Sequence, residues 1–218
     1  NAVSVLQAKA HKVPNFSVLV SQVTVPPAMH TILGSPQNRV QGFLAAGHVC
    51  TVMGYWQYHE LSNQYGIPIV VTGFEPLDLI QGILMTVKQL ENGEQIVQNA
   101  YPRVVTEQGN QPAQEMIYQV FEPCDQKWRG IGVIPKSGLC LREDYADFNA
   151  ENRFDIGHIQ TQESDICIAG AILVGQKKPP ECSAFGVLCA PQNPLGATMV
   201  SSEGACAAYY RFAQPELG

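Results

Sequence analysis

The 218-residue sequence contains no apolar run long enough to cross a membrane, no secretory leader pattern, and no excess of basic residues. Its longest apolar stretches, such as "AGAILVG", fall far short of the roughly 20 residues that a membrane helix needs. The sequence has 13 lysines and arginines and 19 aspartates and glutamates, which gives a net charge of −6. The sequence therefore predicts a cytoplasmic protein that binds neither nucleic acid nor a membrane surface.

Three further signatures are missing. Neither G-x-G-x-x-G nor G-x4-G-K-[ST] follows any predicted strand, which argues against a nucleotide-binding enzyme. No pair of cysteines has the C-x2–4-C spacing that is usual for structural zinc sites. The sequence also starts at Asn1, without a methionine and already within a helical pattern, so we expect it to be a fragment that lacks an N-terminal part.

The first part of the sequence alternates short apolar runs with helical patterns. Strands are predicted at residues 16–20, 42–46 and 67–71, each followed by a helical segment. In the third helical segment apolar residues recur at helical spacing after Pro76, and Asn92-Gly93 supplies the stop signal. Buried strands that alternate with helices are typical of a parallel sheet covered on both faces. The predicted fold class is α/β.

The second part of the sequence has a different composition and a less regular pattern. A helix at 109–122 and a strand at 130–135 are predicted, and short helices and loops rich in Gly, Pro and Ser follow. We expect residues 1–136 to form the α/β part, and residues 137–218 to form a small, irregular, mostly helical, cysteine-rich domain.

Polar side chains follow the predicted strands at the sheet edge where parallel-sheet proteins bind ligands. These are Gln22, His48 and Glu75, one after each strand. A histidine can bind a metal or carry a proton, and a nearby carboxylate can orient it or accept the proton. Simpler roles remain open, since a lone His is more often structural and Glu75 could serve the start of its own helix. Cys50 could be a ligand, a reactive thiol or a small buried side chain.

The seven cysteines are unevenly distributed. Four of them, Cys167, Cys182, Cys189 and Cys206, fall in the last quarter at separations of 15, 7 and 17 residues. Four thiolates match the ligand count of an iron–sulfur cubane or of tetrahedral zinc. The wide spacing favours the cluster, while zinc and unligated thiols stay open. We expect the remaining three, Cys50, Cys124 and Cys140, to form no disulfide with one another, and expect Cys50 beside His48 to be the reactive one.

Six segments in order resemble the HypD family of [NiFe]-hydrogenase maturation proteins, and the resemblance covers essentially the whole sequence. The segments are "NFSVLVSQVTVPPAM", "GHVCTVMG", "GFEPLDLIQGI", "GNQPAQEMIYQVFE", "WRGIGVIPKSGL" and "MVSSEGACAAYY". The resemblance implies two α/β domains that flank a cleft and a third domain with a [4Fe-4S] cluster on the four cysteines. It also implies that His48 and Glu75 line the cleft in which iron is handled.

The resemblance further implies a role in protein assembly. It predicts a maturation scaffold with a redox role, rather than a free-standing enzyme, which helps to assemble the Fe(CN)2CO group of the hydrogenase. The implied partners are a HypC-type chaperone and a HypE-type cyanide donor, and iron carrying CN and CO would be bound transiently in the full-length protein. The alternative is a zinc-stabilised α/β binding module without a redox role.

The sequence departs from the family pattern in three respects. It contains neither the Cys-Pro-x-Cys nor the Cys-Gly-Phe-Glu-Thr-Thr motif of the family's N-terminal half. Gln22 stands where members often have His, and Ala169 in "CIAG" stands where many carry a second thiol. We therefore assign the cluster ligand to Cys167, and expect that the 218-residue chain cannot complete the iron chemistry by itself.

Overall fold

A computed structural model of the chain describes residues 1–154, 156, 158–159 and 162–212. It is a mixed α/β structure built around a three-stranded parallel sheet, with a separate two-stranded antiparallel sheet. The strands are β1 (Phe43–Ala46), β2 (Ile69–Thr72), β3 (Val97–Asn99), β4 (Phe121–Trp128) and β5 (Gly132–Leu141). Among the described residues, no helix has both the length and the apolar content that crossing a membrane requires.

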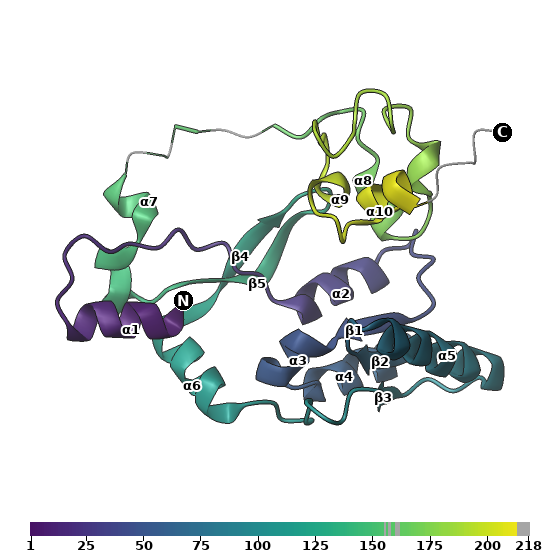
Figure 1. The fold of residues 1–218 in the computed structure, drawn as a ribbon, viewed down its shortest axis with the longest axis horizontal. Coiled ribbons are helices and arrows are strands. Elements are labelled where there is room, and N and C mark those ends of the chain that lie inside the picture. The colour runs from purple at the N-terminus through teal and green to yellow at the C-terminus, as the bar shows by residue number, and fades with distance from the viewer. Residues whose placement is uncertain (155, 157, 160–161, 213–218) are drawn as a thin grey trace.

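The helices range from single turns to one of 17 residues. In chain order they are α1 (Ala2–Ala10), α2 (Val25–Leu33), α3 (Gly47–Met53), α4 (Trp56–Tyr65), α5 (Pro76–Asn92), α6 (Gln111–Val120), η1 (Glu143–Phe148), α7 (Ala150–Arg153), α8 (Ala169–Leu173), η2 (Pro179–Glu181), α9 (Ala197–Val200) and α10 (Ala205–Phe212). Figure 1 shows α2–α5 around the parallel sheet in one lobe, and α8–α10 in a second lobe beyond the tip of the β4–β5 ribbon.

The parallel sheet has the order β1-β2-β3, so its central strand is β2. All four residues of β2 are buried, which fits a strand covered on both faces. Ile69 and Val71 point into a core that side chains of α2, α3 and α4 also line. On the opposite face Thr72 meets α5, and Gly82 lets this helix approach because a side chain there would crowd Thr72 and Leu44.

The sheet differs from the sequence prediction at two strands. Residues 16–20 were expected to form the first strand, but Val18 makes only an isolated bridge with Asn149. The third strand is β3 instead, a short and partly polar segment that the pattern did not indicate. A β-branched run favours extended backbone, but a strand also needs a neighbour with which to pair.

The predicted strand at 130–135 is part of a longer antiparallel hairpin. β5 pairs with β4 from Phe121 opposite Leu141 to Trp128 opposite Gly132, with an irregularity between Cys124 and Gln126. The hairpin runs from a small core around α1 and α6 towards the second lobe (Figure 1). β5 passes through residue 136, at which the sequence analysis placed its domain boundary.

Among the described residues, the second lobe has two contacts with segments of the chain that are far apart in sequence. At the hairpin tip, Gly130 lies against Ala169 and Gly170 at the start of α8. At the other place, the amide of Arg39 donates a hydrogen bond to the carbonyl of Val174 (2.8 Å). Inside this lobe, Met199 and Ala184 pack with cysteine side chains in a core of its own.

Candidate functional site

Four cysteines of the second lobe meet at one narrow cavity. Cys167 precedes α8, Cys182 and Cys189 lie in the loops around η2, and Cys206 lies in the first turn of α10. All four line the same cavity, together with the apolar side chains of Ile172, Phe185 and Met199. The structure therefore brings together the four thiols that the sequence analysis selected, although their spacing of 15, 7 and 17 residues places them on separate loops and helices.

Three of the four sulfur atoms make hydrogen bonds with polar neighbours. The hydroxyl of Thr198, itself only 7% exposed, shares a hydrogen bond of 3.0 Å with the sulfur of Cys206. The amide of Leu195 donates to the sulfur of Cys189 (3.4 Å), and the thiol of Cys182 donates to the carbonyl of Ile166 (3.8 Å). Burial raises the pKa of the Cys206 thiol, and the neighbouring cysteine sulfurs raise it further.

The four thiols do not form a ready-made site for one small ion. Around a zinc ion with bonds of about 2.3 Å, four tetrahedral sulfurs lie roughly 3.8 Å apart. Within the described ranges, no group of three or more His, Cys, Asp or Glu side chains is arranged so that it could hold a metal ion. A group with several irons binds one thiolate at each corner of a larger body, so its ligands need not approach one another so closely.

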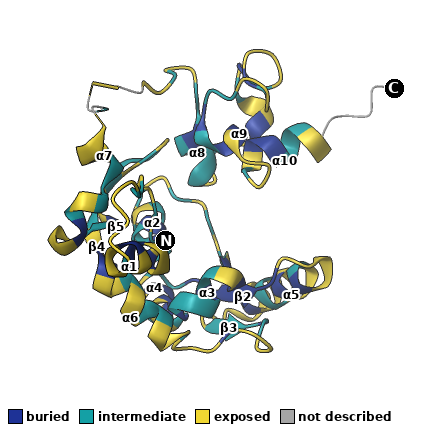
Figure 2. Ribbon diagram, turned by 60° about the vertical axis from the view of Figure 1, so that its left-hand side comes forward, coloured by how far each residue is buried: buried dark blue, intermediate teal, exposed yellow. Residues whose placement is uncertain are grey.

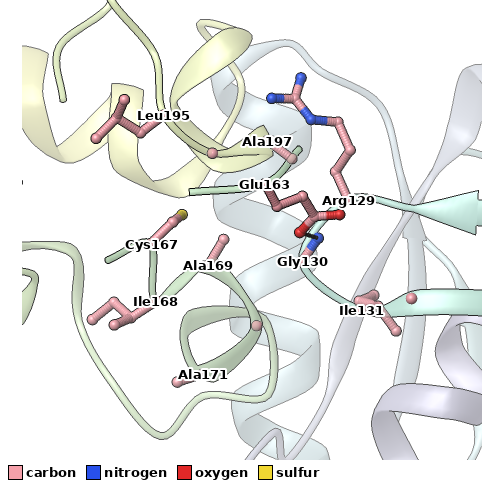
Figure 3. Close-up of a pocket in the computed structure, with 13 residues that line it drawn as sticks. Arg129, Gly130, Ile131, Glu163, Cys167, Ile168, Ala169, Ala171, Leu195 and Ala197 are labelled. Carbon is pink, nitrogen blue, oxygen red and sulfur yellow. Dashed lines mark hydrogen bonds between the residues drawn. The ribbon is translucent and has the colours of Figure 1, made fainter. Parts of the chain in front are cut away.

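A larger cavity of about 450 Å³ adjoins the cysteines on the side of the hairpin tip. It lies between the turn at Gly130 and the start of α8, and Cys167 lines both cavities. The amide of Gly130 donates to the carboxylate of Glu163 (2.9 Å), and Figure 3 shows this pair on one side with Cys167 and Ala169 on the other. One edge of the cysteine site thus faces a space of ligand size.

The second candidate site lies at the carboxyl end of the parallel sheet. Ala46 and Thr72 are register partners at the ends of β1 and β2, so the residues that follow them begin side by side. His48 is exposed there, and its ring lies 4.9 Å from the ring of Phe74. Glu75 is exposed as the residue before α5. His48 and Glu75 therefore belong to the same edge of the sheet.

Arg103 completes this edge and was not identified from the sequence. Its guanidinium binds both carboxylate oxygens of Asp78 (2.8 and 2.7 Å) and lies 3.3 Å from Glu75. It also stacks on the ring of Tyr101 at 4.3 Å. The hydrogen bonds from Arg103 lower the pKa of Asp78, although burial of that carboxylate acts in the opposite direction. Arg103 follows β3, and because β3 was not predicted, the sequence gave no reason to place Arg103 here.

Known proteins resemble nearly the whole of this chain. Residues 1–213 match the family model HypD, described as the hydrogenase formation hypA family. The chain belongs to the HypD family. It is 45% identical over 218 residues to the hydrogenase maturation factor HypD of Cupriavidus necator, and 43% identical over 218 residues to that of Escherichia coli K12. The HypD of Azotobacter vinelandii is 44% identical over 217 residues.

The HypD relatives are longer than this chain. The matches cover 97% of the chain and 58% of the Cupriavidus protein, 99% and 58% for Escherichia, and 97% and 57% for Azotobacter. The chain thus spans a little under three fifths of the length of these HypD proteins.

Gln22 marks a further polar position in this HypD chain. The side-chain oxygens of Gln22 and Thr24 are buried and have no hydrogen-bond partner within the described part of the chain. Thr24 lines a cavity of about 210 Å³ between α2, α3, α6 and the hairpin, which Lys136 and Tyr118 also line. Gln22 does not line this cavity, so of the two unpartnered oxygens only that of Thr24 belongs to a residue of its wall.

The expectation that Cys50 is reactive is wrong. Cys50 is fully buried in the core beneath the sheet, with its sulfur 4.0 Å from the hydroxyl of Tyr58. Burial raises the pKa of its thiol to about 11, so the reactive thiolate is scarce at neutral pH. Its position two residues after His48 places it on the inner side of α3, away from the exposed imidazole.

The expectation that Cys124 and Cys140 stay unpaired is also wrong. They form a disulfide across the β4–β5 hairpin, and their Cα atoms are 6.0 Å apart. Adjacent strands bring Cα atoms into the distance range that a disulfide requires. The pair could not be expected from the sequence, because β4 was not predicted and the 16-residue separation alone says nothing about strand pairing.

Proposed function

We propose that this chain is the part of a [NiFe]-hydrogenase maturation scaffold that carries a [4Fe-4S] cluster and half of the site for its iron cargo. The observation that carries the proposal is the meeting of Cys167, Cys182, Cys189 and Cys206 at one cavity in a chain of the HypD family. Membership of a family of hydrogenase maturation factors supports the biological process that we propose. The four thiols of the second lobe, which we call the cysteine lobe, support the proposed cluster.

The side chains of the lobe are of the kinds that such a cluster needs, although they leave only about 10 Å³ of free space between them, so binding would require the cysteines to move apart. Four thiols from separate segments provide the required ligand count. The side chain of Thr198 and the amide of Leu195 already bond two of the sulfurs, and such bonds orient thiolates and tune a bound metal group. When bound, a [4Fe-4S] cluster supplies one-electron transfer. The protein residues hold it, exclude water through Met199 and Phe185, and leave the Cys167 edge open towards the larger cavity.

The residues at the edge of the parallel sheet would bind the iron that is to receive the CN and CO ligands. The exposed imidazole of His48 can bind iron or hold a proton, and it lies beside Phe74 at the carboxyl ends of β1 and β2. Glu75 offers a carboxylate beside Arg103, whose position Asp78 fixes by two hydrogen bonds. The further thiols and the partner proteins, a HypC-type chaperone and a HypE-type cyanide donor, would come from outside this chain.

Anaerobic reconstitution with iron and sulfide tests the cluster. We expect four irons and four sulfides per chain, a brown chromophore and an EPR signal after reduction, as the [4Fe-4S] formula requires. Cys182→Ala should abolish them, whereas Cys50→Ala, at a buried cysteine outside the lobe, should leave them intact. A colourless protein that retains one zinc per chain would instead support the zinc-stabilised binding module.

A separate variant tests the sheet edge. In a full-length HypD, His48→Ala should impair hydrogenase maturation while the cluster spectrum stays unchanged, because His48 lies in the first turn of α3, beside the parallel sheet, and not in the cysteine lobe. His59→Ala serves as the matched control, since His59 is a half-exposed histidine that pairs with Glu107. Equal maturation by the His48 and His59 variants would rule out a cargo role for His48.

A further inference from the structure

The loop that follows β3 is tied to the carboxyl end of the parallel sheet by a single side chain. Asn99, the last residue of β3, pairs with Val71 of the buried strand β2, and Figure 2 shows these two strands side by side. The side-chain amide of Asn99 donates a hydrogen bond to the carbonyl of Val105 (2.9 Å), and its oxygen accepts one from the amide of Tyr101 (2.8 Å). Residues 99–105 are therefore held in shape by contacts within the chain itself.

The ring of Tyr101 in this loop lies against two glycines at the ends of the neighbouring strands. Gly47 directly follows β1, and Gly73 directly follows β2. A Cβ atom at either glycine would lie 2.8 Å from a ring carbon of Tyr101, and one at Gly73 would also collide with the carboxylate of Asp78. The loop thus packs tightly on the strand ends, and Gly47 is the residue before His48.

Arg103 reaches from the same loop to two carboxylates of different burial. Its guanidinium stacks on the ring of Tyr101 and bonds both oxygens of Asp78, whose side chain is only 7% exposed. The nitrogen that binds Asp78 at 2.7 Å also donates to the carboxylate of Glu75 (3.3 Å). An exposed ion pair alone is weak, because both of its side chains move freely. Here the arginine is held by a buried carboxylate and an aromatic ring, so it presents a cation to Glu75 at a fixed place.

We propose that Arg103 is a positioning residue, which holds the carboxylate of Glu75 in place for iron that binds at this sheet edge. The inference rests on the cargo role proposed above for the edge. Carboxylates that bind metals are usually hydrogen-bonded in turn, and those bonds orient them. Arg103 bonds Oε2 of Glu75, and the second oxygen of the same carboxylate can bind a metal. Arginine suits this role because its planar fork can bond two carboxylates at once, whereas a lysine ammonium is a single point of charge.

The affinity of a cluster-loaded, full-length HypD for ferrous iron, measured by chelator competition, tests the role of Arg103. Arg103→Lys keeps a positive charge beside Asp78 but cannot also hold Glu75, so the affinity should fall at least about 10-fold while the melting temperature stays close to that of the wild type. Arg142→Lys is the matched control, since Arg142 is similarly exposed and lies 3.3 Å from Glu122, on the β4–β5 hairpin. That variant should bind iron as the wild type does.

A double-mutant cycle separates positioning from a general loss of structure. If Arg103 acts through Glu75, Glu75→Gln should lower the iron affinity, and the addition of Arg103→Lys should lower it no further. Two losses that multiply would show that Arg103 acts independently of Glu75, and they overturn the proposal. An Arg103→Lys protein that binds iron as tightly as the wild type overturns it as well.

Two further variants cover a loss of stability and a failure of the site itself. If Arg103→Lys lowers the melting temperature, the double variant Asp78→Asn/Arg103→Gln takes its place, because it leaves no buried charge without a partner. It should stay folded and bind iron at least about 10-fold more weakly than the wild type, and wild-type affinity overturns the proposal. His48→Ala tests the edge independently: weakened binding in His48→Ala but not in Arg103→Lys refutes the positioning role alone, whereas wild-type binding in both refutes the cargo role of the edge.

Discussion

A single methyl group at Gly196 should disturb the cysteine site. Gly196 precedes α9 and lines the same cavity as the four cysteines. A Cβ atom built on it would collide with the sulfur of Cys167 and lie 3.5 Å from the Cβ of Ala169. The backbone of Gly196 is extended, with φ −136° and ψ 161°, so alanine can adopt it without strain. Gly196→Ala therefore acts through steric contact alone.

The expected effects follow from this contact. Overpacking a tight interior costs about 1–3 kcal/mol, and because the displaced atom is the end of a partly exposed side chain we expect a loss at the lower end, about 1 kcal/mol, in the free energy of unfolding of the cysteine lobe. The sulfur of Cys167 must move from its present position. Displacing a ligand in this way should weaken iron binding by about 10- to 100-fold, the range found when residues that position metal ligands are changed.

Chelator competition after anaerobic reconstitution measures the iron affinity, and denaturant unfolding measures the stability. Gly93→Ala is the control: nothing lies within 4 Å of its Cβ position, but its φ of +69° makes alanine unfavourable there. That variant should lose about 1 kcal/mol of stability and keep its iron affinity. If Gly196→Ala binds iron as the wild type does and unfolds at the same denaturant concentration, the close contact between residue 196 and Cys167 is refuted.

Three more predictions concern the α/β lobe. With a pKa of about 11, the Cys50 thiol should react slowly with iodoacetamide at pH 8 in the folded protein and quickly after unfolding in urea; equal rates would contradict its burial. Because Arg103 lowers the pKa of Asp78 in the folded state, the pair stabilises the protein above the ordinary carboxyl pKa of about 4, and stability falls as the pH drops through the lowered value. Asp78→Asn should flatten this acid-side loss in a pH series of thermal melts, and an unchanged slope would argue against the pair. Ile69→Ala in the central strand should cost about 2–5 kcal/mol in denaturant unfolding, whereas Ile96→Ala, at a side chain 50% exposed, should cost much less; similar losses would contradict the core.

The helix at 76–92 shows what local pattern can and cannot predict. Pro76, the apolar period and Gly93 predicted its existence and its end, because these signals act within a few residues. These local signals did not predict which side of the helix packs against the sheet. An apolar stripe usually marks the buried side, yet in α5 Asp78 and Gln89 are buried because their partners, Arg103 and Ile96, come from distant positions.

The candidate sites were predictable to different degrees. The four cysteines stood out by residue type and count, and the structure brings them to one cavity without testing their role. His48 and Glu75 could be placed at one sheet edge because parallel neighbouring strands end together. Arg103 and the Cys124–Cys140 disulfide depend on β3 and β4, whose polar residues and proline give no strand signal of their own.

The two separate contacts of the cysteine lobe also limit how it can move. A rigid body held at one point can pivot in any direction, but a body held at two points can rotate only about the line that joins them. Here that line runs from Gly130 at the hairpin tip to Val174 after α8. Both contact points on the lobe lie at α8, one at its start and one just after its end, so α8 is the part of the lobe that these contacts hold in place.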